Sequence, residues 1–255
     1  MIVLKSPREI EEMRRVNRIV AEILERIRQA VKAGVCTKDL DDIAAEEVRR
    51  RGVVAAFKGV KSPQGTPYPA SLCTSVNDEV VHGIPRVDRV LREGDLVSVD
   101  FGVFDRGVYG DAALTIPVGI VPPRALALIR AAEAALDAGI AEALPGRRLG
   151  DVCAAIQETV EGAGFTVVRE FVGHGIGRSL HEDPQVPNYG ERGTGVRLKA
   201  GMVLAIEPMI NDGVVGVVVD PDGWTARTKD GSLASHAEHT VAITERGPDI
   251  LSRLE

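Results

Sequence analysis

The sequence is poor in cysteine and in aromatic residues and has no long apolar run, and these shortages exclude several classes of protein. Three cysteines occur in 255 residues, Cys36, Cys73 and Cys153, so neither a disulfide framework nor a zinc knuckle is indicated. No stretch approaches the roughly 18 apolar residues of a membrane-spanning helix, and the apolar start over residues 2–4 is too short for a secretory signal. We therefore expect a cytoplasmic protein with no membrane partner.

A surplus of positive charge is also missing. The chain has 31 Lys and Arg against 37 Asp and Glu, a formal net charge of −6, and the two signs alternate along the predicted helices. Such a pattern argues against nucleic acid as a partner. What the chain does have is 44% hydrophobic residues, enough for one large core or two modest ones. We expect a globular protein.

Helix signals occur in two pairs. Ser6-Pro-Arg-Glu9 combines a capping residue, a proline at the first helical position and a glutamate three places on. Apolar residues then recur at three- and four-residue intervals, the pattern of an amphipathic helix. On such signals we predict four helices, from Ser6 to near Gly34, from Thr37 to about Arg51, from Pro122 to about Leu144, and from about Leu149 to Glu161.

Strand signals follow each helix pair. Short segments rich in Val and Thr, separated by Gly, Pro and Asp, cover residues 71–81, 96–103 and 108–118, and similar segments fill the chain after the fourth helix. Leu40-Asp-Asp-Ile-Ala-Ala45 also resembles Leu149-Gly-Asp-Val-Cys-Ala154. We therefore predict a single α+β domain over residues 1–255, with pseudo-symmetric halves of roughly 6–120 and 121–255 and an antiparallel sheet flanked by helices.

Two aspartates occupy neighbouring strands of the first half. Asp100 shares a strand face with the small residues Ser98 and Gly102. A two-residue turn at Asp105-Arg106 would place Asp100 directly opposite Asp111, with Cβ atoms about 5 Å apart, where like charges repel. A divalent cation between them would turn this repulsion into binding. Two aspartates at a solvated sheet edge remain an equally good interpretation of this pair alone.

The second half repeats the arrangement. Val203-Leu-Ala-Ile-Glu207 is an apolar strand that ends in a carboxylate, and a later strand carries Glu238. A turn at Asp222-Gly223, a favoured turn dipeptide, would set Glu207 opposite Glu238. Pro208 predicts that the first of these strands bends or ends there. Residues 229–231 are expected to interrupt the register, so this pairing is only suggested.

Histidines supply the other candidate ligands. Two of the five fall in the glycine-rich segment from Gly173 to His181, where the backbone can approach a bound group closely. Oxygen-rich ligation with one imidazole suits Co, Mn, Fe or Zn in a two-metal site, in which a shared water becomes hydroxide and hydrolyses the substrate. His236 and His239 flank Glu238 on opposite strand faces, His236 on the same face as Glu238. Both are interpreted as structural residues.

Seven segments together resemble the methionine aminopeptidases of the pita-bread fold, and the similarity covers nearly the whole chain. The resemblance implies five ligands for two divalent metal ions: Asp100, Asp111, His174, Glu207 and Glu238. The segments are Ser75-Val-Asn-Asp-Glu-Val-Val-His-Gly-Ile-Pro85, Ser98-Val-Asp-Phe-Gly102, Gly110-Asp111, Gly173-His-Gly-Ile-Gly177, His181-Glu-Asp-Pro184, Ile206-Glu-Pro-Met209 and Glu238-His-Thr240.

The resemblance also implies roles. Asp111 and Glu238 would bridge the metals, and Glu207 would relay protons. His82 would face the scissile nitrogen and leaving amine, and His181 would stabilise the oxyanion. The methionine pocket would be lined by Tyr68, Cys73 and Trp224. The substrates implied are nascent polypeptides with a small second residue, and the ribosome is a further candidate partner. The protein is expected to be a monomer.

Some features depart from the pattern or narrow it. Leu180 and Gly65 stand where many relatives carry an aromatic residue, so a looser pocket is expected. His181 and Glu207 are too close in sequence for the helical insertion of type II enzymes, and no extension precedes the first helix. The chain therefore resembles the short bacterial type I form.

Two rival hypotheses remain. A prolidase or Xaa-Pro aminopeptidase would share the five ligands, but usually carries an amino-terminal domain. A non-catalytic peptide-binding protein of the same fold would be expected to have lost ligands, whereas all five positions keep ligand-type residues.

Overall fold

The computed structural model of the chain describes residues 2–254. Its helices are α1 (Pro7–Ala30), α2 (Thr37–Arg51), α3 (Pro123–Glu142) and α4 (Leu149–Gly162). All four helices predicted from the sequence are present within a few residues of the expected bounds. The capping box predicted at the start of α1 is also formed, because Ser6 and Glu9 each accept a hydrogen bond from the other's backbone N–H.

The strands form one large sheet and two small ones, and all the pairings between these strands are antiparallel, as predicted. The large sheet contains β1 (Val54–Ala55), β2 (Cys73–Val76), β4 (Leu96–Asp105), β5 (Val108–Pro117), β7 (Gly173–Gly175), β8 (Glu182–Val186), β9 (Val203–Ile206), β14 (Glu238–Thr244) and β15 (Gly247–Ile250). The small sheets contain β6 (Thr166–Val167), β10 (Met209–Asn211) and β13 (Ala234–His236), and β3 (Glu79–Val81), β11 (Val217–Val219) and β12 (Ala226–Thr228).

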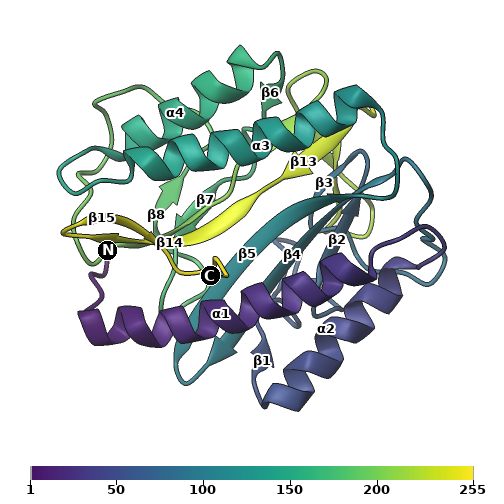
Figure 1. Cartoon of the computed structure of the whole chain (residues 1–255), viewed down its shortest axis with the longest axis horizontal. Helices are drawn as coiled ribbons and strands as arrows, with labels where there is room; N and C mark the ends of the chain where they lie inside the picture. The colour runs from purple at the N-terminus through teal and green to yellow at the C-terminus, as the bar shows by residue number, and fades with distance from the viewer. Residues whose placement is uncertain (1, 255) are drawn as a thin grey trace.

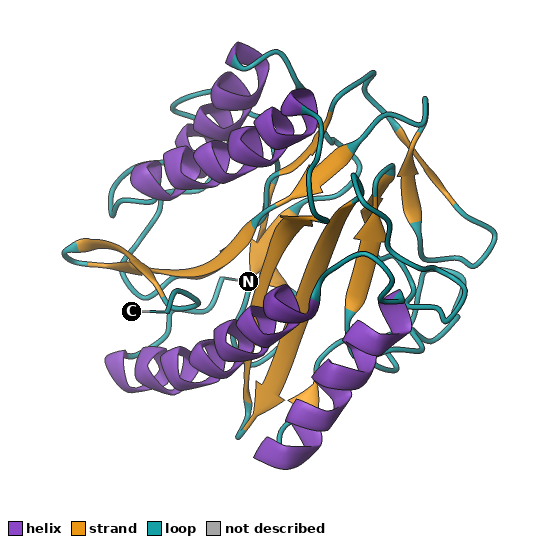
Figure 2. Cartoon of the chain, turned by 45° about the vertical axis from the view of Figure 1, so that its right-hand side comes forward, coloured by secondary structure: helices purple, strands orange, loops and turns teal. Residues whose placement is uncertain are grey.

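In Figure 1 the pair α3 and α4 lies at the top and the pair α1 and α2 at the bottom. In the turned view, strands of the sheet are visible in the gap between the two pairs (Figure 2). One apolar cluster joins α1 and α2 to β4 and β5, and a second joins α3 and α4 to β9 and β14. The halves meet where β5 pairs with β14. Two adjoining cores under two helix pairs match the α+β architecture expected from the sequence.

Alternation along the strands decides which side chains face the helices. Val99 and Phe101 of β4 pack in the cluster under α1, as does Ala112 of β5. Asp100 and Asp111, their neighbours in sequence, therefore point to the opposite face of the sheet. This face carries no helix pair, so the polar side chains of the sheet gather there.

The expected register of the first hairpin is wrong by two residues. The turn residues are Arg106 and Gly107, both with positive φ (48° and 90°), and Asp105 pairs with Val108. A two-residue turn of this kind needs positive φ at both central positions, and glycine at the second makes it favourable. As a consequence Asp111 lies opposite Gly102, and Asp100 is its diagonal neighbour instead of its direct partner.

The suggested register of the second half is found in the structure. Ile206 pairs with His239 and Met209 with His236, and the same register continues to the turn that contains Asp222 and Gly223. Glu207 and Pro208 lie between β9 and β10, where the strand ends as Pro208 predicted. The ladder therefore changes from the large sheet to a small one at Glu207.

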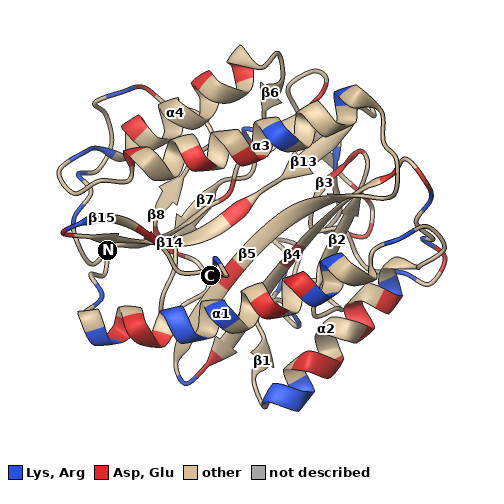
Figure 3. Ribbon diagram, viewed as in Figure 1, with Lys and Arg blue, Asp and Glu red and all other residues tan. Residues whose placement is uncertain are grey.

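Charges are mixed over the molecule, with acidic and basic side chains interspersed along α1 and α2 (Figure 3). Within residues 2–254, no helix is both long enough and apolar enough to span a membrane.

Candidate metal centre

Three carboxylates lie on one face of three adjacent strands. Asp100 of β4 and Glu238 of β14 both stand opposite Ala113, in the central strand β5. Asp111 lies two residues before Ala113 and therefore on the same face. Because Ala113 has only a methyl group, the space above it stays open to the longer acidic side chains around it.

Two further ligand-type residues approach from the second half. His174 of β7 stands opposite Ala205, and Glu207 follows Ala205 by two residues, so both share the face of Glu238. His174 Nε2 lies 3.5 Å from Glu207 Oε1. The strand β7 is short and glycine-flanked, and a Cβ on Gly173 would meet Ala205 O at 2.4 Å, so glycine is needed for β7 to lie this close to β9.

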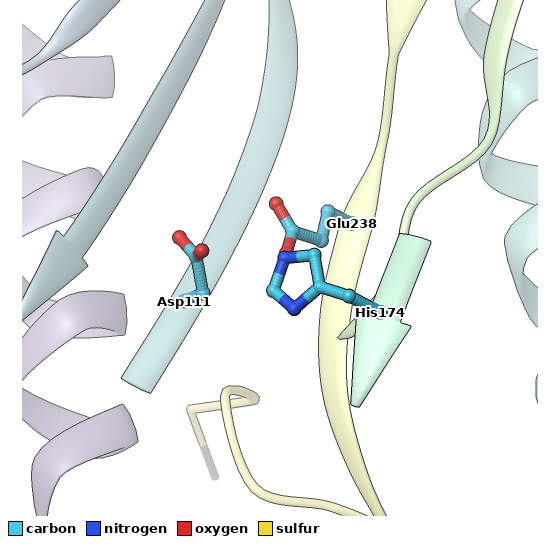
Figure 4. Close-up of side chains that lie close together, drawn as sticks. All are labelled: Asp111, His174 and Glu238. Carbon is cyan, nitrogen blue, oxygen red and sulfur yellow. The ribbon is translucent and has the colours of Figure 1, made fainter. Parts of the chain in front are cut away.

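The side chains of Asp111, His174 and Glu238 converge on one point (Figure 4), and one ligand atom of each lies within 4.8 Å of the others. They come from β5, β7 and β14, so both halves contribute. Asp100 and Glu207 line the same cavity. All five residues expected to hold metal are therefore brought together by the fold.

The cluster is built from buried acids whose charge is not neutralised. Burial raises the pKa of Asp100 to about 7 and that of Glu207 to about 8. Burial, with repulsion from the other carboxylates, raises the pKa values of Asp111 and Glu238 well above their usual range. One oxygen each of Asp100, Asp111 and Glu238 is buried without a hydrogen-bond partner among residues 2–254.

Unpaired buried carboxylate oxygens are costly unless a cation binds them. Oxygen donors with one imidazole also suit divalent metals such as Mn, Fe, Co and Zn. The donor set present therefore fits a divalent metal, and it sits at a depth where a bound ion would be shielded from bulk water.

Two histidines stand at the sides of the cluster. His181 stacks edge-on against His174 with ring centroids 4.4 Å apart, and burial lowers its pKa. His82 follows β3 with a φ of 60°, an uncommon conformation for a non-glycine residue, and burial lowers its pKa to about 4. Both imidazoles are therefore neutral near pH 7, able to donate one hydrogen bond and accept another.

An apolar compartment adjoins the acidic cluster. Tyr68, Cys73 and Trp224 form a small cluster together with Phe57, and the rings of Tyr68 and Trp224 meet edge to face at 5.1 Å. The buried hydroxyl of Tyr68 is within hydrogen-bond distance of two backbone carbonyls, Leu72 O and Gly83 O, and donates to them. All ten residues that the sequence singled out for the site line one cavity of about 250 Å³.

Sequence reasoning missed several residues of this cavity. Phe57, Phe171 and Met209 line it. Of the two positions expected to loosen the pocket, Leu180 lines the cavity and Gly65 is not among the lining residues. Met209 was within reach, because it directly follows the Glu-Pro pair of a matched segment. Phe57 carried no signal in its own sequence, since it reaches the cavity only through close contact with Gly102.

His236, interpreted from the sequence as a structural residue, lies next to the cluster. His236 Nε2 lies 3.6 Å from Glu207 Oε2 and has no hydrogen-bond partner among the described residues. Strand alternation already placed it on the face of Glu238. His239, on the other face, pairs through Nδ1 with Ser252 Oγ at 2.8 Å, away from the cluster, as predicted.

A cluster of buried carboxylates and one imidazole, at the end of an open cavity in an antiparallel sheet, defines the class of metal-dependent hydrolases. Comparison with known proteins makes the class specific. Residues 11–245 match the model of metallopeptidase family M24, and the chain belongs to this family. The resemblance found in the sequence is thereby confirmed, as is the use of a divalent metal.

Similar proteins match the chain over its whole length. It is 49% identical to a methionine aminopeptidase of Aquifex aeolicus, over 99% of each chain, and 48% identical to methionine aminopeptidase 1 of Bacillus subtilis, over 100% of each. The crystal structure of a methionine aminopeptidase from Thermotoga maritima superposes with a TM-score of 0.95 at 49% identity and covers 100% of both chains.

More distant structures share the fold alone. A prolidase from Pyrococcus furiosus superposes with a TM-score of 0.75 at 21% identity, and the chain covers 66% of its length. The expected pita-bread fold is therefore common to both groups of structures, while the similarity in sequence is far greater to the aminopeptidases.

Proposed function

We propose that the chain is a methionine aminopeptidase that hydrolyses the first peptide bond of polypeptides beginning with methionine and a small second residue. The observation that carries the proposal is the single cavity in which a metal-type carboxylate cluster adjoins an apolar compartment. The compartment is lined by apolar and aromatic side chains, which suits an apolar side chain of the substrate. Cys73 in its wall offers a polarizable sulfur to a thioether.

Two divalent ions would be held by Asp100, Asp111, His174, Glu207 and Glu238, with Asp111 and Glu238 shared between them. When bound, such ions supply Lewis-acid activation of water and of the scissile carbonyl. The three unpaired carboxylate oxygens support this ligand set, since a cation would satisfy each of them. The residues do not distinguish Co, Mn, Fe and Zn.

The remaining roles follow from position and protonation. Glu207 lines the cavity beside His174, where its carboxylate could take up a proton from the attacking water and give it to the leaving amine. His82 and His181 are both neutral donors on the cavity wall. We assign His82 to the scissile nitrogen and His181 to the oxygen that gains charge, where one such donor typically contributes a few kcal/mol.

The proposal extends to the setting of the reaction. The substrates would be amino termini of nascent chains, met by a monomeric enzyme in the cytoplasm. The three free cysteines, at positions 36, 73 and 153, are compatible with a reducing compartment.

Release of free methionine tests the proposal directly. The protein is stripped of metal with a chelator, supplied with one divalent metal at a time, and offered Met-Ala-Ser and Ala-Pro-Ala. We expect metal-dependent release of methionine from the first peptide and no cleavage of the second. Cleavage of the prolyl peptide alone would indicate a prolidase or an Xaa-Pro aminopeptidase. Metal binding without cleavage of either peptide would favour a peptide-binding protein.

A further inference from the structure

One arginine holds three carboxylates at the junction of the two halves. The Arg227 guanidinium donates to Asp220 Oδ2 at 2.8 Å, to Glu79 Oε1 at 2.9 Å and to both oxygens of Asp78 at 3.2 Å. Its side chain is 26% exposed and that of Glu79 only 7%. The planar guanidinium can contact several acids at once, which a lysine ammonium does less well.

The three acids belong to different structural units. Asp78 and Glu79 lie at the start of β3 in the first half, and the other oxygen of Glu79 accepts the backbone N–H of Val76 at 2.7 Å. Asp220 lies in the turn between β11 and β12 in the second half, where its backbone bonds to Thr225. Arg227 therefore ties β3 to the β11–β12 hairpin.

This hairpin carries one wall of the cavity. Trp224 directly precedes Thr225 and β12, and its ring faces Tyr68 at 5.1 Å and His82 at 5.9 Å, both edge to face. Ladder contact between β12 and β3 is short and irregular, with a register shift between Ala226 and Arg227. The hairpin is also tied to the first half by Trp224 Nε1, which donates to Thr66 O at 3.1 Å, and by Thr228 N, which donates to Asp78 O at 2.8 Å. The ion-pair cluster adds a charged connection to these two hydrogen bonds, on the side of β3.

His82 has independent support on the first-half side. The next residue, Gly83, accepts from Thr74 N and Tyr68 Oη and donates to Ser75 Oγ. A Cβ on Gly83 would meet Thr74 O at 2.2 Å, so this backbone is tightly enclosed. Loss of the Arg227 cluster would consequently release the hairpin and Trp224 more than it releases His82.

We propose that Arg227 is a positioning residue that holds the β11–β12 hairpin against β3 and so sets the width of the side-chain compartment between Trp224 and His82. Without the guanidinium, the three acids of the two units lose the cation that bonds all of them, while Arg89 still acts as a positive charge on Glu79. The remaining repulsion between Asp78 and Asp220 favours an outward movement of the hairpin. The part of the inference that concerns substrate affinity rests on the proposed function, whereas the position of Trp224 does not.

Fluorescence of Trp224 gives a direct readout, because it is the only tryptophan in the chain. In the full-length Arg227→Ala variant we expect red-shifted emission and stronger quenching by acrylamide. With Met-Ala-Ser we expect KM to rise about tenfold and kcat to change by less than about threefold, since the compartment widens while His82 stays in place. Arg227→Lys keeps one positive charge and should fall between the two.

Arg192→Ala is the matched control. Arg192 also bonds two carboxylates, Glu142 and Glu158, but on the outside of α3 and α4. It should leave emission and KM unchanged. If Arg227→Ala lowers only the thermal midpoint, with emission and KM as in the unsubstituted protein, or if Arg192→Ala shifts both equally, the inference is overturned.

The claim about Trp224 can still be tested if a variant does not fold or if the protein shows no activity. Should Arg227→Ala fail to fold, Asp220→Asn removes one carboxylate from the cluster, and a smaller red shift is then expected; unchanged emission in that variant would count against the proposal. If neither the unsubstituted protein nor any variant releases methionine, the proposed function is wrong. The emission of Trp224 would still show whether Arg227 holds the β11–β12 hairpin in place.

Discussion

The two halves deliver paired carboxylates to the same place with different backbones. In the first half, Asp100 and Asp111 sit inside two ten-residue strands joined by a two-residue turn. In the second half, Glu207 lies just beyond β9 and Glu238 begins β14, and some thirty residues of interrupted hairpin separate them. Both aspartates stand inside long strands, whereas Glu207 lies between two strands and Glu238 stands at the first residue of β14, opposite Ala113.

The backbones that carry the acids are held in different ways. The ladder between β4 and β5 runs without interruption on both sides of Asp100 and Asp111. At Pro208 the chain passes from the large sheet into a small one, and Glu207 lies at this junction. The first half thus provides a rigid platform, and the second half provides side chains whose backbone is held by separate contacts.

The largest expected effect comes from the second half. Glu207→Gln should reduce kcat by about a thousandfold or more, because an amide can ligate weakly but cannot relay a proton. The fold should be unchanged, since Glu207 lies outside the ladders. Kinetics with Met-Ala-Ser and circular dichroism measure the two parts of this prediction.

Glu245→Gln is the control for this substitution. Glu245 is exposed in the turn between β14 and β15, so the same chemical change there should leave kcat as it was. Substantial activity in Glu207→Gln would remove this residue from the proposed mechanism and would leave the second half with a ligand role only.

Metal removal should have the next largest effect, which is on thermal stability. The pH dependence of the stability of the metal-free protein distinguishes one shared acidic cluster from two separate pairs of acids. In the folded chain, burial raises the pKa of Asp100 to about 7 and that of Glu207 to about 8. In the unfolded chain both carboxyls titrate near pH 4. These two groups therefore hold more protons in the folded state, and their contribution to stability falls as pH rises from about 4 to about 8. Burial lowers the pKa of all five histidines, whose contribution rises with pH up to about 6.5, so the fall should be clearest between about pH 6.5 and pH 8.

We accordingly expect the chelated protein to melt at a lower temperature at about pH 8 than at about pH 6.5. Added Mn²⁺ should reverse this trend, because metal binding requires the deprotonated carboxylates. Thermal denaturation across this range, with and without metal, measures both effects. A flat profile in the chelated protein would mean that the four acids are not held together as the geometry indicates.

The same contrast explains how far sequence reasoning reached. The four helices and the alternation around Asp100 and Glu238 were predictable, because capping signals and strict alternation are local properties, whereas the full set of five ligands came from the resemblance. The first register was missed by two residues because the glycine at 107 was left out of the turn. The face of His236 was predicted by alternation, but its distance of 3.6 Å from Glu207 was not, because it depends on the pairing of β10 with β13, two segments far apart in the sequence.

The smallest expected effect concerns the two turn glycines, one for each hairpin. Gly107 has a φ of 90° and Gly223 a φ of 78°, and a Cβ at either position would meet no atom closer than 3.8 Å. Alanine at either site should therefore cost a similar amount, roughly 1–2 kcal/mol of backbone strain, in denaturant unfolding. The functional consequences should differ.

Gly107 lies at the far end of β4 and β5, and its loss should leave KM for Met-Ala-Ser unaltered, because the long ladder holds Asp100 and Asp111 in place. Gly223 immediately precedes Trp224, so Gly223→Ala should raise KM measurably for the same loss of stability. If Gly107→Ala also raised KM, the first half would not be the rigid platform that its ladder suggests. If Gly223→Ala left KM unaltered, the Trp224 wall would be fixed by β12 and the Arg227 cluster, with no contribution from the turn.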